Sequence, residues 1–306
     1  MALTILEYAK TQQNDLLRGV IETFAKTSPI LQLLPMMNID GNAFQYNQED
    51  VLPGIAFRGI NEGYTESTGL LNPLVEKLKI MGGDADTDLF LTKTQKSSAA
   101  SRRQIDTAMK VKAAALGFTK SFFDGNESIY ATEFDGLNQR IAGNQSIAAG
   151  DNGADLSENM LQRLIDAVDG KPTALLMGKK MRRQLFNLAK GSTILGVTQD
   201  AFGRQISTYA DVPIFVIETD VNGATILDFD ETQGSAVGTT GSIYAVRFED
   251  MYISGIQAGP IDVRDLGEQD SKPVERVRIE WYCGFAVFHP KAAARLKGIT
   301  AASGVL

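Results

Sequence analysis

Residues 42–88 read NAFQYNQEDVLPGIAFRGINEGYTESTGLLNPLVEKLKIMGGDADTD and predict one long extended hairpin. The outgoing arm is 42–58, the tip is 59–69 and the return arm is 70–88. The arms offer no apolar face of their own to bury, and a two-stranded hairpin is at best marginally stable in water. We therefore expect another copy of the chain to support the hairpin, which suggests an assembly protein. The alternative is a sheet meander inside an ordinary domain.

The composition is that of a globular chain without a disulfide or zinc framework. The 306 residues, 43% of them hydrophobic, predict one elaborate domain or two intimately joined ones. A net charge of -7 argues against tight binding of nucleic acid, whose phosphates require Lys and Arg. The single cysteine, Cys283, excludes an intrachain disulfide and indicates a reducing compartment. No apolar run reaches membrane-spanning length, and the first residues lack the basic and apolar regions of a secretion signal, so we expect neither membrane insertion nor secretion.

Apolar spacing predicts the other elements of the chain. An amphipathic arm over 4–34 packs either on its own domain or on a neighbour. A helix over 98–123 follows, with an apolar stripe of Ala108, Val111, Ala115, Phe118 and Phe122. Next come two helices, four short strands and a mobile loop, and finally a long strand and an Ala-rich helix. The two helices are predicted over 161–168 and 181–191, and the four short strands over 173–177, 213–218, 225–229 and 243–248. The mobile loop is predicted over 191–211, the long strand over 277–287 and the Ala-rich helix from Lys291 onward.

The residues that could carry catalysis or bind a metal do not form a recognisable site. His289 is the only histidine, and its place at the end of a strand before Pro290 predicts a packed or solvated ring. Cys283 falls on the apolar face of the long strand, which predicts an inert core thiol. Asp84, Asp86 and Asp88 have the spacing of a calcium loop but lack its Gly and Glu, so we expect one polar strand edge.

Two further strings fail as motifs for the same kind of reason. The run Asp228-Phe-Asp-Glu231 could pair carboxylates, but a turn is the simpler interpretation. The run Gly178-Lys-Lys-Met-Arg-Arg183 has Thr173 and Lys180 where a phosphate-binding loop needs Gly and Ser or Thr. It predicts an exposed basic helix start suited to ion pairs between subunits. We therefore assign no catalytic, cofactor-binding or metal-binding residue and expect no enzyme activity.

The order of elements and three strings carry a resemblance to a known family. The strings are AFRGINEGYTESTG at 56–69, IDVRDLGE at 261–268 and EWYCGFAVFHP at 280–290. Together with a terminal arm, a long loop, a long helix, an α/β region and a closing strand, they resemble the major capsid proteins of tailed bacteriophages with the Hong Kong 97-type fold. The resemblance spans essentially the whole chain.

The resemblance implies an α+β fold with named parts. Residues 1–37 would be the N-arm and 38–90 the extended loop. Residues 91–155 and 246–306 would form the peripheral domain with its spine helix, and 156–245 the axial domain. Copies would assemble as pentamers and hexamers into an icosahedral shell around double-stranded DNA. The protein would lie in the virion after assembly in the bacterial host cytoplasm.

Two departures from the family pattern alter what the resemblance implies. Some members join subunits through a lysine in the extended loop, yet no Lys lies between Thr27 and Glu76, so we expect noncovalent contacts. Some members begin with a scaffolding region, whereas this sequence enters the arm at Met1, so we expect a separate scaffolding protein or a trimmed precursor. A portal is the other expected partner, with a decoration protein as a further candidate, and packaged DNA would be enclosed without tight binding.

Two alternative functions remain open. One is an encapsulin-like bacterial compartment of the same fold, which would carry an enzyme as cargo. The other is a soluble hydrolase or ligand-binding domain that uses its carboxylates, which would require a concave pocket with convergent acids.

Overall fold

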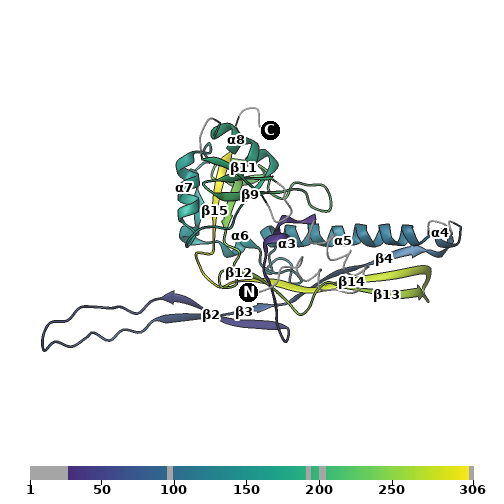
Figure 1. The fold of residues 1–306 in the computed structure, drawn as a ribbon, viewed down its shortest axis with the longest axis horizontal. Coiled ribbons are helices and arrows are strands. Elements are labelled where there is room, and N and C mark those ends of the chain that lie inside the picture. Colours follow the sequence, from purple (N-terminus) through teal and green to yellow (C-terminus); the bar gives the residue numbers. More distant parts are fainter. Residues whose placement is uncertain (1–26, 95–98, 191–193, 200–204, 303–306) are drawn as a thin grey trace.

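The computed structural model describes residues 27–94, 99–190, 194–199 and 205–302. Figure 1 shows an elongated molecule with two bodies of secondary structure and a long hairpin that projects from its base. The helices are α3 (Pro29–Leu33), α4 (Leu89–Thr94), α5 (Ala99–Asp124), α6 (Leu137–Arg140), α7 (Glu158–Asp166) and α8 (Lys179–Leu188), with a 3-10 turn at Gly143–Gln145.

The first sheet is built on β14 (Lys272–Val287), which has neighbours along nearly its whole length on one edge and from Val274 to Cys283 on the other. One edge pairs with β4, and the other pairs with β13 near the start of β14 and with β12 near its end. The short β1 extends the sheet beside β12. The bounds are β1 (Met36–Asn38), β4 (Lys79–Asp88), β12 (Ile253–Gln257) and β13 (Asp262–Gln269).

The apolar alternation of β14 is buried against α5. Val277, Ile279, Trp281, Cys283 and Phe285 are all buried, as predicted for one wholly apolar face. The buried stripe of α5 contains Val111, Ala115, Phe118 and Phe122, whereas Ala108 is exposed. The ring centroids of Phe118 and Trp281 lie 5.0 Å apart, and those of Phe122 and Phe285 lie 4.9 Å apart. The long helix and the long strand therefore form one core.

The second sheet has eight strands in the order β5-β15-β11-β6-β9-β8-β7, with β10 beside β11. The helices α7 and α8 contribute Leu161, Leu164, Met181 and Leu185 to the core on one of its faces. The other face shares the core of α5. The bounds are β5 (Ser146–Ala148), β6 (Ala174–Gly178), β7 (Leu195–Gln199), β8 (Gln205–Tyr209), β9 (Val212–Ile217), β10 (Glu231–Gln233), β11 (Ala236–Val246) and β15 (Ala293–Thr300).

The hairpin is shorter than the sequence predicts. It consists of β2 (Ala43–Val51) and β3 (Leu70–Lys77), which pair only with each other. The chain then passes through Leu78 into β4, which pairs with β14 from Lys79 to Asp88. The predicted return arm from Leu70 to Asp88 is therefore two strands, β3 and β4, with different partners. The alternating pattern continues through both, because alternation alone does not specify which strand is the partner.

Three local predictions are wrong. The segment from Ala293 is strand β15 and not an Ala-rich helix, because it pairs with β11 in the interior of the second sheet. Residues 225–229 form no strand apart from an isolated bridge at Thr225. Between 191 and 211 the described residues form the antiparallel pair β7–β8 and not an irregular loop. Residues 4–26 of the predicted arm over 4–34 lie outside the described residues.

Candidate assembly interface

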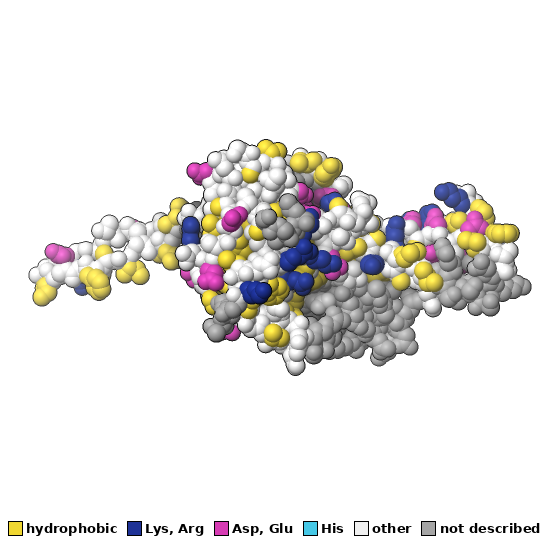
Figure 2. Space-filling model, turned by 90° about the horizontal axis from the view of Figure 1, so that it is seen from above, with side chains coloured by type: hydrophobic (Ala, Val, Ile, Leu, Met, Phe, Trp, Pro, Cys, Tyr) yellow, Lys and Arg dark blue, Asp and Glu magenta, His cyan; other side chains and the backbone are white. Residues whose placement is uncertain are grey.

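The outer part of the hairpin has no contact that buries it. Every residue from Val51 to Pro73 is exposed. Ile60 is 95% exposed, and Ile55 and Phe57 are more exposed still. Figure 2 shows hydrophobic side chains along this projecting part. Apolar side chains gathered on an exposed projection mark an interaction surface, since burying them would be favourable.

The tip of the hairpin is ordered by its own contacts. The Arg58 guanidinium donates to the carbonyl oxygen of Glu62 at 3.2 Å and lies 5.2 Å from the ring centroid of Tyr64. The Glu62 carboxylate accepts from the backbone N–H of Gly59 at 2.8 Å. Asn61 takes a left-handed conformation with φ of 67°, as a tight turn requires. The tip thus presents its apolar side chains on a defined backbone.

The base of the hairpin packs on the body, which the sequence analysis did not predict. Along β2 the side chains of Phe44, Tyr46 and Gln48 are half-buried, while those between them are exposed. The Tyr46 ring lies 4.9 Å from the ring of Phe288 in an edge-on arrangement, and its hydroxyl donates to the carbonyl oxygen of Val287 at 3.0 Å. The base of the hairpin is therefore fixed to the body, whereas its outer half, residues 51–73, is exposed throughout.

An ion pair fastens the other strand of the hairpin. Glu76 of β3 forms a two-pronged pair with Arg140, the last residue of α6. The Tyr46 hydroxyl also lies 3.3 Å from a carboxylate oxygen of Glu76. Burial, together with this nearby carboxylate, raises the pKa of Tyr46 to about 12. The hydroxyl therefore remains a donor throughout the neutral range.

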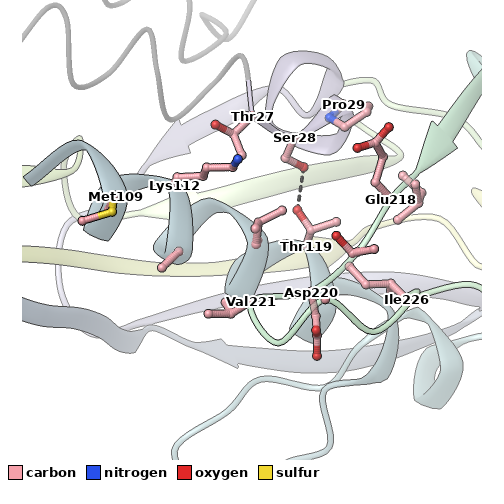
Figure 3. A pocket seen from close by; sticks show the side chains of 15 residues that line it. Thr27, Ser28, Pro29, Met109, Lys112, Thr119, Glu218, Asp220, Val221 and Ile226 are labelled. Atoms are coloured by element: carbon pink, nitrogen blue, oxygen red, sulfur yellow. Dashed lines mark hydrogen bonds between the residues drawn. The ribbon is translucent and has the colours of Figure 1, made fainter. Parts of the chain in front are cut away.

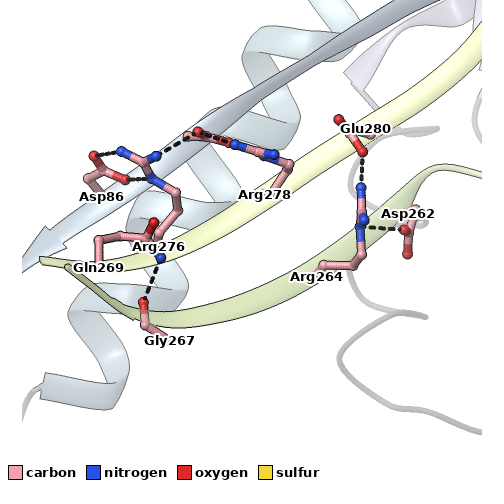
Figure 4. Close-up of polar contacts among 9 residues, drawn as sticks. Asp86, Asp262, Arg264, Gly267, Gln269, Arg276, Arg278 and Glu280 are labelled. Carbon is pink, nitrogen blue, oxygen red and sulfur yellow. Dashed lines mark hydrogen bonds and ion pairs between the residues drawn. The ribbon is translucent and has the colours of Figure 1, made fainter. Parts of the chain in front are cut away.

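The face of the first sheet that points away from α5 combines an apolar pair with a ladder of charges. Ile80 of β4 and Tyr282 of β14 are register partners, with 73% and 41% exposed surface. Further along, Arg278 pairs with Asp84 and Arg276 pairs with Asp86, each through two hydrogen bonds (Figure 4). These hydrogen bonds hold the pKa of both carboxyl groups below the ordinary value.

The three acids predicted to form a polar strand edge lie there, at Asp84, Asp86 and Asp88. What the sequence did not reveal is the pairing of two of them with arginines about 190 residues away in the chain. Arg264 of β13 continues the charged face, because it pairs with both Asp262 and Glu280. Strand register could not be predicted from the sequence, and it alone brings these residues together.

A cleft of about 420 Å³ lies between α5, the start of α3 and the loop after β9. Figure 3 shows Ser28 and Thr119 joined across its wall, where the Thr119 hydroxyl donates to Ser28 at 2.6 Å. On the loop, the carboxylate of Asp220 accepts from Lys120 at 2.9 Å and from two backbone N–H groups. These contacts join the two bodies of the molecule across the cleft.

The residues considered for catalysis are buried, hydrogen-bonded or ion-paired within the fold. Burial raises the pKa of the Cys283 thiol well above its ordinary value. His289 accepts a hydrogen bond from the backbone N–H of Lys291 at 3.2 Å. Asp228 pairs with Lys180, and Glu231 pairs with Arg295.

The basic start of α8 is occupied within the chain. Besides the Lys180 pair, Lys179 forms an ion pair with Glu218. Among the described residues, no group of three or more His, Cys, Asp or Glu side chains could hold a metal ion. No helix in the described part of the chain is both long and apolar enough to cross a membrane.

Comparisons with known proteins agree with this geometry. Residues 12–162 match the family model described as major capsid protein GP7. A comparison of the sequence with curated proteins finds no significant match. Among solved structures, the SrpI encapsulin complex of Synechococcus elongatus PCC 7942 is similar, with a TM-score of 0.67, 14% identity and 90% of each chain covered. So are the capsid of a native GTA particle and a chain from Microbacterium phage Oxtober96. The GTA capsid has a TM-score of 0.61 at 13% identity, with 90% of this chain and 91% of its own covered. The Oxtober96 chain has a TM-score of 0.62 at 14% identity, with 89% of this chain and 90% of its own covered.

The fold is therefore the Hong Kong 97-type α+β fold shared by capsid proteins and encapsulins. Within this class, residues 12–162, about half of the chain, match the family described as major capsid protein GP7, so the function that the comparisons support is that of a bacteriophage major capsid protein. It is a structural protein of the virion that self-associates into the shell, and not an enzyme. The hydrolase alternative is thereby excluded, and the compartment alternative is the less supported one.

Proposed function

We propose that the outer half of the hairpin is the extended loop by which one copy holds its neighbour within pentamers and hexamers of an icosahedral shell. The observation that carries this proposal is the complete exposure of residues 51–73 together with their apolar side chains. A lone copy leaves this surface in water, whereas a neighbour would bury it. Fully burying side chains such as Ile55 and Phe57 is worth about 1.5–3 kcal/mol each.

The matching surface on the neighbour would be the sheet face around Ile80 and Tyr282. Figure 1 shows the hairpin projecting away from the first sheet, and Ile80 follows the end of β3 by three residues, so the tip and this receiving surface lie at opposite ends of the hairpin. Contacts between two different surfaces of identical subunits close into rings when the rotation allows it. Such head-to-tail contacts would generate pentamers and hexamers from one chain.

The hairpin contact would be noncovalent. Within the described residues from Thr27 to Glu76 the sequence has no lysine that could form an isopeptide bond. Its tip instead offers apolar side chains and one arginine, Arg58, whose charge is already engaged with the tip. Stability of the shell would then come from burial summed over many copies.

The proposed parts of the chain follow the elements with modified bounds. Residues 1–37 would be the N-arm and 42–78 the extended loop, since 79–88 belongs to the first sheet. The first sheet with α5 would be the peripheral domain. The second sheet with α7 and α8 would be the axial domain, and it would include β5 and β15 in addition to residues 156–245.

Other partners are proposed on the resemblance alone. A separate scaffolding protein would guide assembly in the host cytoplasm, a portal would occupy one vertex, and a decoration protein is a further candidate. The shell would enclose double-stranded DNA with little affinity for it, in keeping with a net charge of -7. An encapsulin-like shell would instead hold an enzyme, and the neighbouring genes distinguish the two: terminase and portal genes against a cargo enzyme.

Removal of the tip tests the extended-loop assignment. Two separate variants are made: one lacks Asn61–Gly69, and the other carries Phe57→Ser. Both should fold normally by circular dichroism but yield few or no closed particles by electron microscopy. Scaffolding protein is supplied in this assay if the wild type needs it. Ile129→Ser is the matched control, because Ile129 is equally an exposed apolar residue but lies on the body. Closed particles at wild-type yield from both tip variants would overturn the assignment. Loss of the fold on deletion would show instead that the tip belongs to a core.

A further inference from the structure

We propose that the pair Arg140–Glu76 is a positioning clamp that fixes the direction in which the hairpin leaves the body and thereby the geometry at which the shell closes. This rests on the proposed role of the hairpin as the extended loop. The pair joins the last residue of α6 to β3, across 64 positions of the chain. One of its two hydrogen bonds runs from Nη2 of Arg140 to Oε2 of Glu76 and is 2.7 Å long.

The arginine is held from the body side before it reaches the hairpin. Its Nε donates to the carbonyl oxygen of Asp135 at 2.8 Å, and its guanidinium lies 4.6 Å from the ring centroid of Phe285. Phe285 is buried in the core between β14 and α5. Because the guanidinium is planar and rigid, these two contacts fix the plane in which it can meet a carboxylate. The body therefore dictates where Glu76 must lie.

The carboxylate in turn links the two strands of the hairpin to that plane. Glu76 stands opposite Phe44 in the β2–β3 register, on the half-buried side that includes Tyr46. The Tyr46 hydroxyl lies within hydrogen-bond distance of both Glu76 and the backbone of β14. The pair itself is shielded, since each of its side chains is only 16% exposed. Water and salt weaken such a pair less than an exposed one.

The remaining length of the hairpin converts a small change at this clamp into a large one at the tip. The 14 residues from Tyr46 to Ile60 span about 45 Å if extended at 3.3 Å per residue. A rotation of about 10° at the base would then move the tip by about 8 Å, by simple geometry on that length. This displacement exceeds the width of a side chain, so the tip would miss a fixed site on the neighbour. The clamp thus acts on assembly more strongly than on the fold of the subunit.

The variants Arg140→Lys and Glu76→Gln test the clamp. The first substitution would keep the positive charge without the planar fork, and the second would keep the shape of the side chain without its negative charge. The matched control is Arg295→Lys with Glu231→Gln, a pair in the second sheet with 16% and 23% exposure and a 2.8 Å contact. The measurements are thermal unfolding of the subunit, hydrogen exchange of the amides in 43–48 and 72–77, and particle diameter by electron microscopy.

We expect both clamp variants to fold, to exchange the amides of the hairpin base at least tenfold faster, and to give a severalfold smaller fraction of closed particles of wild-type diameter. The control variants should keep wild-type particles. Particles of wild-type yield and diameter from both clamp variants would overturn the clamp while leaving the hairpin assignment intact, provided that Phe57→Ser abolishes closure. Unfolding of both clamp variants would also overturn it, because the pair would then be part of the fold. If Phe57→Ser closes normally, the hairpin assignment itself has failed.

Discussion

Lys120 of α5 donates a 2.9 Å hydrogen bond to the carboxylate of Asp220, whose side chain is nearly inaccessible to water in the loop after β9. The same carboxylate accepts from the backbone N–H groups of Asn222 and Ala224. One residue of the second body therefore orders its own loop and ties that loop to the helix of the first body. Such a group should stabilise the folded subunit only while it is ionised.

The pH dependence of stability tests this relationship. The hydrogen bond from Lys120 and those from the backbone lower the pKa of Asp220 below its ordinary value. Since the pKa is lower in the folded state, the carboxylate stabilises the fold above its unfolded pKa of about 3.9, and this stabilisation is lost as the pH falls through the folded pKa. Asp220→Asn should therefore lower the urea midpoint at pH 7 and flatten its decline in acid.

The control for that variant is Asp270→Asn in the exposed turn between β13 and β14. It should leave the midpoint and its acid decline close to those of wild type. Equal midpoints for Asp220→Asn and wild type at pH 7 would contradict the proposed joining role of Asp220.

The aromatic contact between α5 and β14 should be the largest single contribution to the first core. Phe118 is fully buried, and its ring contacts Trp281 and Phe134 at 5.0 and 5.6 Å. Phe118→Ala should destabilise the subunit by about 3–5 kcal/mol, the usual cost of removing a buried aromatic ring. Trp281 is the only tryptophan, so its fluorescence reports the unfolding directly. A loss below about 1 kcal/mol, as for an exposed alanine substitution, would contradict this assignment of the core.

These two elements show what could be predicted from the sequence. The alternation over 277–287 and the 3–4 spacing of the α5 stripe are local patterns, and each determines which side chains are buried once the element forms. The segment after Lys291 has an equally local signal, its alanines, but that signal misled. Ala292, Ala293 and Ala294 are buried, the last two in the strand beside β11, where tertiary pairing overrides helix propensity.

The anchor of the hairpin could not be predicted, because its parts are distant in the chain. Glu76 and Arg140 belong to separate elements, and nothing in either local sequence specifies the other. Ile55 and Phe57 lie in the predicted outgoing arm, but the sequence pattern did not mark them as an exposed apolar surface. The point at which the hairpin ends was misjudged because Lys79–Asp88 continues the same strand pattern with a new partner.

Gly178 should be indispensable for a steric reason. A Cβ atom at this position would lie 1.9 Å from the carbonyl oxygen of Leu227, whose segment crosses the start of α8. Gly178→Ala must displace that backbone and should cost about 1–3 kcal/mol, as overpacking of a core does. Gly63→Ala is the matched control, because a Cβ there meets no atom within 4 Å. Thermal or urea unfolding of the two variants should separate them clearly, and equal stability would refute the close approach.

Cys283 should report the opening of the core between α5 and β14. The thiol is fully buried, and that burial raises its pKa, so the reactive thiolate is absent from the native state at neutral pH. A thiol reagent should therefore label the native subunit only as fast as the core opens, and Phe118→Ala should accelerate labelling because it lowers the cost of opening. Cys283→Ser should destabilise the subunit by about 1–3 kcal/mol by burying a hydroxyl, and more than Cys283→Ala does. Rapid labelling of the wild-type subunit under native conditions would mean that β14 is accessible to solvent and that the core is not continuous along it.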